Sequence, residues 1–142
     1  MNEAAIIRAL QQGVTAAVAA STTPTLPVKY LEVNQDAAGN PWQEPNDAKW
    51  LELVWIPNNR TGDFWGSEKN YRGLFRLVLH WPNEGGGVYA PLGVIGSIAD
   101  YFHKGRMLSG VQIYEAPDFQ GTIAQGSETL YPVSLRYSSY RS

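Results

Sequence analysis

Apolar residues near the start of the chain recur with the period of an α-helix. Ile7, Leu10 and Val14 follow one another at spacings of three and four, which places them on one helical face, while arginine, glutamine and threonine fall largely on the other. The pattern predicts a helix over residues 3–20 that ends in the Ser-Thr-Thr-Pro sequence. Gly13 costs about 1 kcal/mol relative to alanine inside a helix, so we expect a close packing contact there.

Period-two alternation predicts the strands. It is clearest over residues 71–81, where Phe75 and Leu77 share one face and His80 lies on the other, more polar face. Pro27 cannot donate to a strand ladder, so the first strand is expected at a sheet edge. The predicted strands cover residues 26–31, 49–56, 71–81, 108–115 and 130–138.

A second helix is predicted over residues 90–104, with Pro91 in its first turn and Gly105 just past its end. The residues therefore predict one α+β domain over residues 1–142, in the order α-β-β-β-α-β-β. We expect one mostly antiparallel sheet of four to five strands with both helices on one face. The expected core contains Ile7, Leu10, Val14, Leu53, Trp55, Phe75, Leu77, Leu79, Ile95, Ile98, Phe102, Val133 and Leu135.

Composition narrows the classes of function. Hydrophobic residues make up 44% of the 142 residues, which is ample for a core, and the formal net charge is −2. The chain has no basic excess with which to release counterions from duplex DNA, so tight DNA binding is not expected. The absence of cysteine excludes disulfides, thiolate catalysis and cysteine-based metal sites. Glu3 and Arg8 mark the amino-terminal helix as mature rather than a signal peptide, and no apolar run is long enough for a membrane span.

Signatures of catalysis, metal binding or cofactor binding are missing from the sequence. Neither His80 nor His103 has a second histidine or a carboxylate at metal-ligand spacing, so each is interpreted as a surface or satisfied histidine, with His103 in the last turn of the second helix. The glycine run at 85–87 lacks the lysine of a phosphate-binding loop, and no GxSxG motif is present. No catalytic, metal or cofactor residue is assigned.

Two tryptophans, Trp42 and Trp65, lie in predicted loops, whereas three others lie in strands. The loop tryptophans could form a sugar-stacking platform, anchor a protein interface or fold back over the sheet. Residues 57–70 make a long hairpin connection compared with the usual two to five residues. This connection carries Arg60, Phe64 and Trp65, which we call the tip residues. Together with Trp42 they form the candidate interface.

Local phrases along nearly the whole chain carry a resemblance. They are IIRALQQGV, LPVKY, KWLELVWIP, YRGLFRLVLHWPNEG, GVIGSIADYFHKG and YPVSLRYSSY. The most telling is a strand that opens with Arg72-Gly73, ends in Trp81-Pro82 and is followed by Glu84. In order and spacing these phrases resemble the tail terminator (tail completion) proteins of long-tailed bacteriophages, in the lambda-like branch.

The resemblance implies a structural protein of the virion tail, assembled in the host cytoplasm, without a catalytic site, cofactor or membrane. Its implied partners are further copies of itself in a cyclic, hexameric ring, the tail tube protein and the head-tail connector. The ring would cap the tube, stop its polymerisation and offer the head-joining surface, while DNA passes through the lumen without specific binding. On this reading residues 57–70 contact a neighbouring subunit or the tube. Two alternatives stay open: another neck or head-tail joining protein, and a small carbohydrate-binding module or enzyme that uses the loop tryptophans.

Overall fold

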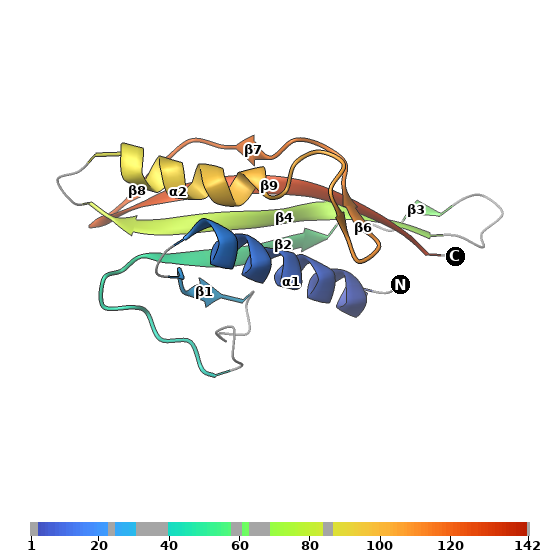
Figure 1. Ribbon diagram of the computed structural model, residues 1–142, viewed down its shortest axis with the longest axis horizontal. Helices are drawn as coiled ribbons and strands as arrows, with labels where there is room; N and C mark the ends of the chain where they lie inside the picture. The colour runs from blue at the N-terminus through green and yellow to red at the C-terminus, as the bar shows by residue number, and fades with distance from the viewer. Residues whose placement is uncertain are drawn as a thin grey trace.

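The computed structural model describes residues 3–22, 25–30, 40–57, 61–62, 69–83 and 87–141. In this part of the chain two helices lie over the same face of one curved sheet (Figure 1). The elements are α1 (Glu3–Ser21), β1 (Val28–Lys29), β2 (Trp50–Pro57), β3 (Thr61–Gly62), β4 (Lys69–Pro82), α2 (Tyr89–Asp100), β5 (Met107–Leu108), β6 (Val111–Ile113), β7 (Asp118–Phe119), β8 (Ile123–Gln125) and β9 (Glu128–Arg141). The predicted α+β class with two helices is confirmed.

Two long antiparallel strands, β4 and β9, form the centre of the sheet and pair along their whole length. The main path of the sheet runs β1-β2-β4-β9-β6-β5, with β3 paired to β4 and with β7 and β8 paired to β9. The β1–β2 pair is parallel, and the other described pairs are antiparallel. The sheet is therefore mixed, and β1 lies at an edge as Pro27 predicts.

The prediction of four to five strands in the order α-β-β-β-α-β-β is wrong, because the described residues form nine strands. The single strand predicted over 108–115 is a hairpin, since Ser109 and Gly110 both have positive φ, at 48° and 91°, and reverse the chain between β5 and β6. The predicted loop at 116–129 contains β7 and β8. Both short strands pair with the backbone edge that β9 offers, and β8 does so where β9 begins two residues earlier than predicted.

The second helix ends four residues earlier than predicted, at Asp100. The Tyr101 N–H bonds to the Ile98 carbonyl at 3.2 Å, which tightens the last turn and directs Phe102 into the core. His103 is consequently exposed beyond the helix, and its predicted position in the last helical turn is wrong. Its Nδ1 lies 3.1 Å from the Lys104 carbonyl oxygen.

The core lies between the helices and the sheet. Of the predicted core residues all are buried except Ile7 and Trp55, which are partly buried and pack against the core, while the neighbouring Ile6 is buried. The Trp55 indole donates its Nε1–H to the Tyr137 hydroxyl oxygen over 2.7 Å. Burial raises the pKa of the Tyr137 phenol, and the hydrogen bond from the indole opposes that shift.

Two glycines are fixed by close packing. A Cβ at Gly13 would lie 3.2 Å from side-chain atoms of Leu108 and Phe102, which confirms the close contact expected in α1. A Cβ at Gly73 would lie 2.6 Å from the Tyr137 hydroxyl oxygen and 2.9 Å from the Ile56 carbonyl oxygen. Gly73 therefore allows the Tyr137 ring to cross β4 and pack beneath β2.

Candidate functional site

The tip residues Arg60, Phe64 and Trp65 lie outside the described residues. Trp42, the fourth member of the candidate interface, is described. The described part of the candidate interface therefore consists of Trp42 and the surfaces next to it.

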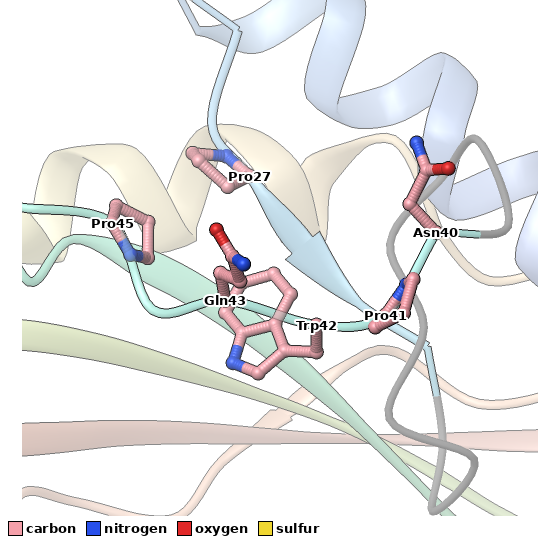
Figure 2. Close-up of a pocket in the computed structure, with 6 residues that line it drawn as sticks. All are labelled: Pro27, Asn40, Pro41, Trp42, Gln43 and Pro45. Atoms are coloured by element: carbon pink, nitrogen blue, oxygen red, sulfur yellow. The ribbon is translucent and has the colours of Figure 1, made fainter.

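Trp42 lines a pocket of about 530 Å³ between the start of β1 and the segment that leads into β2 (Figure 2). None of the described residues that line it carries a charge. They are Pro27, Asn40, Pro41, Trp42, Gln43 and Pro45. Prolines and an indole with two amides make a neutral surface that suits an apolar or amide-bearing ligand better than a charged one.

The Trp42 ring is half-buried and does not stand free in solvent. Its centroid lies 5.0 Å from that of Trp50, tilted by 47°, and Trp50 stacks in turn on the His80 ring at 3.7 Å and 6°. The Trp50 Nε1–H is buried and has no acceptor among the described residues. Ring contacts therefore connect the pocket to the middle of the sheet.

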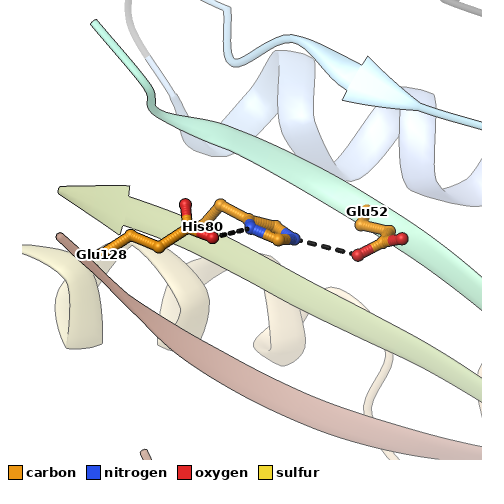
Figure 3. Close-up of polar contacts among 3 residues, drawn as sticks. All are labelled: Glu52, His80 and Glu128. Carbon is orange, nitrogen blue, oxygen red and sulfur yellow. Dashed lines mark hydrogen bonds and ion pairs between the residues drawn. The ribbon is translucent and has the colours of Figure 1, made fainter. Parts of the chain in front are cut away.

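His80 lies between two carboxylates from neighbouring strands, an arrangement we call the His80 clip (Figure 3). Its Nε2 is 2.9 Å from an oxygen of Glu52 on β2, and its Nδ1 is 3.2 Å from an oxygen of Glu128 on β9. His80 itself is buried. Both contacts are hydrogen bonds donated by the ring only when both nitrogens carry a proton. The clip joins three adjacent strands, so the interpretation of His80 as a satisfied histidine is confirmed.

The clip perturbs the titration of Glu52. The hydrogen bond from His80 lowers the pKa of the Glu52 carboxyl below its ordinary value of 4.5, and the charges of His80 and Lys29 act in the same direction against partial burial. Sequence reasoning missed this cluster because Glu128 lay in a predicted loop. The available signal was the pairing of two alternating strands. His80 pairs with Trp50, and Glu52, two residues further along the same strand, faces the same side of the sheet as His80.

The clip is not a metal site. The two carboxylates lie on opposite sides of the imidazole, so the three groups do not converge on one point (Figure 3). Within the described ranges no group of three or more His, Cys, Asp or Glu side chains could hold a metal ion. Neither described helix is long and apolar enough to cross a membrane.

A second pocket, of about 400 Å³, lies where the end of α1 approaches α2 and the sheet. Trp81 and Val94 supply apolar walls, and Asp47 and Lys49 add charges of both signs. The Lys49 Nζ lies 4.6 Å from the Trp81 ring centroid, a cation–π distance. This pocket is more amphipathic than the one at Trp42.

Large apolar side chains are also exposed at several places on the described surface. They are Ile56, Val88, Tyr89, Met107, Phe119 and Ile123. Single exposed apolar residues are ordinary. Phe119 and Ile123 differ because their strands, β7 and β8, lie along the outer side of β9 and are exposed at every residue.

Comparison with known proteins identifies the relatives of the chain. A family model described as phage tail terminator protein matches residues 5–137. A solved structure superposes with a TM-score of 0.76 at 20% identity, over 98% of this chain and 96% of that one. That likeness supports the fold alone. No curated protein matches the sequence.

Proposed function

Because the chain belongs to the phage tail terminator protein family, a structural family, we propose that it forms a cyclic ring that caps the phage tail tube. The ring is a hexamer that stops addition of tube subunits and provides the surface for head joining. Within the family we place the chain in the lambda-like branch. The observation that carries the proposal is the match of one family model to residues 5–137.

The described surface supports an assembly role better than a catalytic one. The titratable cluster at His80 is occupied internally, with each ring nitrogen held by a carboxylate. The hollowed and apolar features are spread over the surface, as expected for a subunit that makes contacts on several sides. A head-to-tail ring requires two different patches on each subunit, one for each neighbour.

The proposed partners are other copies of the chain, the tail tube protein and the head-tail connector. DNA passes through the lumen without specific binding, in keeping with a net charge of −2. Assembly takes place in the host cytoplasm and involves no membrane. The tip residues and Trp42 are proposed contacts with a neighbouring subunit or with the tube.

Electron microscopy of negatively stained particles tests this function. The purified protein is imaged alone and after mixing with tubes assembled from the tube protein of the same phage. We expect sixfold rings at one end of each tube and an arrest of tube growth. Native mass spectrometry measures the number of subunits. Tubes that grow equally well with and without the protein, and carry no ring at either end, would refute the proposal. If the protein is found on the head connector but never on the tube, the result would favour a different neck or head-tail joining role.

A further inference from the structure

The outer edge of β8 is unpaired within the described residues and carries neither a charged side chain nor a proline. Residues 119–127 contain no charged side chain, and Ile123 is 51% exposed. Gln125 and Glu128 flank a two-residue turn and form a hydrogen-bonded pair, so the Ala124 N–H and C=O point away from β9. Edge strands of soluble proteins normally carry lysine, proline or inward charges that prevent pairing with another chain. This edge is instead suited to pairing.

The opposite edge of the sheet carries the neutral pocket at Trp42. Pro27 at the start of β1 forms one wall, and residues 40–45 form the other (Figure 2). In Figure 1, β1 and β8 lie on opposite sides of the sheet, with β2, β4 and β9 between them. One subunit therefore presents an uncharged strand on one side and an uncharged pocket on the other.

The two edges also lie at the same level along the strands. Trp50 pairs with His80, His80 with Leu130 and Leu130 with Ile123. The parallel register of Val28 with Leu51 places Pro27 beside Trp50 at the end of the same row. Pro27 and Ile123 thus lie at the two ends of one row of residues that crosses the sheet. Neighbouring subunits can therefore join edge to edge with no shift of one subunit along the strand direction.

We propose that β8 of one copy of this chain binds the pocket at Trp42 of the next copy, in a direction antiparallel to β1. The strand directions agree, because β1 and β9 run together and β8 runs against both. Ile123 packs on Pro27 and Trp42 of the neighbour, and the pocket is complete only when the neighbour supplies this strand. The contact rests on the proposed ring and names the two patches that form it.

Engineered cysteines test the contact directly, because the chain has none of its own. One variant carries Gln43→Cys in the pocket and a second carries Gln125→Cys on β8, and the two are mixed and oxidised under mild conditions. Within one chain the edges are four strand spacings apart, about 19 Å, so a disulfide between these positions must join two chains. The matched control pairs Gln43→Cys with Gln112→Cys, an exposed position on β6.

The proposal expects a disulfide-linked heterodimer in the Gln43→Cys and Gln125→Cys mixture at a yield at least about tenfold above the control. A yield equal to the control overturns the contact, whatever the oligomeric state. Native mass spectrometry of the wild type is recorded alongside. Rings without this cross-link would refute the contact and leave the proposed function standing. A cross-link in a protein that forms rings neither alone nor on tubes would support the contact and count against the ring.

A second pair of variants uses charge. Ile123→Lys places a cation in the proposed contact, and Met107→Lys places one on β5, where Met107 is 59% exposed. Both variants should fold, because both side chains face solvent in the subunit, and circular dichroism checks that they do. The ring population should fall at least about tenfold for Ile123→Lys and stay unchanged for Met107→Lys. Equal ring populations in the two variants would overturn the proposal.

Discussion

Replacement of Gly96 by alanine should stabilise the protein. Gly96 lies inside α2, is exposed, and a Cβ built on it meets no atom within 4 Å. Glycine in a helix interior is about 1 kcal/mol less favourable than alanine, because its unfolded chain has more conformational freedom to lose. With no steric cost to offset the gain, Gly96→Ala should raise the free energy of unfolding by about 1 kcal/mol.

Urea denaturation followed by circular dichroism measures the effect. For an m-value of about 2 kcal/mol/M the midpoint should rise by about 0.5 M with the slope unchanged. The melting temperature should rise by about 3 °C. Gly93 lies in the same helix, also meets no atom within 4 Å, and should respond in the same way.

Gly13→Ala is the matched control, since it makes the same change in α1 at a packed position. The new Cβ would lie 3.2 Å from Leu108 and Phe102, both buried, and overpacking of this kind costs about 1–3 kcal/mol. The steric cost should therefore exceed the helical gain, and the midpoint should fall. An unchanged or lower midpoint for Gly96→Ala, or an equal rise for both variants, would refute the reasoning.

Three further predictions concern the core, the clip and the loop. Leu77→Ala should lower the free energy of unfolding by about 2–5 kcal/mol in urea denaturation, because the side chain is fully buried. Because the pKa of Glu52 is lowered in the folded state, its carboxylate stabilises the fold above pH 4.5, and this stabilisation is lost as the pH falls through the folded pKa. Glu52→Gln should therefore flatten the dependence of the free energy of unfolding on acidic pH. Glu115→Gln, on the exposed surface, should not. Alanine at all three tip residues should leave the circular dichroism spectrum and melting temperature unchanged while ring formation or tail joining fails, and unfolding of this variant would show that the loop covers the core.

The elements that could be predicted from the sequence are those with a sustained period. α1, β2, β4 and β9 each extend over eight residues or more and bury one face against the core, so their alternation is visible without knowledge of the fold. β7 and β8 have two and three residues and are exposed throughout. Such strands carry no alternation of their own and depend on the backbone edge that β9 offers. The Ser109-Gly110 turn did have a local signal, because serine-glycine pairs are typical of turns.

The candidate site could be predicted only in part, for a related reason. An indole in a loop is unusual, which singles out Trp42 in the sequence, and the structure places it at a neutral pocket. The His80 clip depends on the register of three strands. Glu128 completes it, and this residue lies two positions before the predicted start of the last strand. Register is a property of the assembled sheet and is not visible in any one segment.

The row of residues between the two proposed contact patches has a mechanical consequence for the proposed ring. A ring closes only if the angle between the two patches of a subunit is the same in every copy. Pro27 and Ile123 end one row, and that row passes through Trp50 and His80, which stack at 3.7 Å. The clip ties β2, β4 and β9 together at this row. Deformation between the patches would have to break these contacts, so the buried His80 can fix the geometry on which closure of the proposed ring depends.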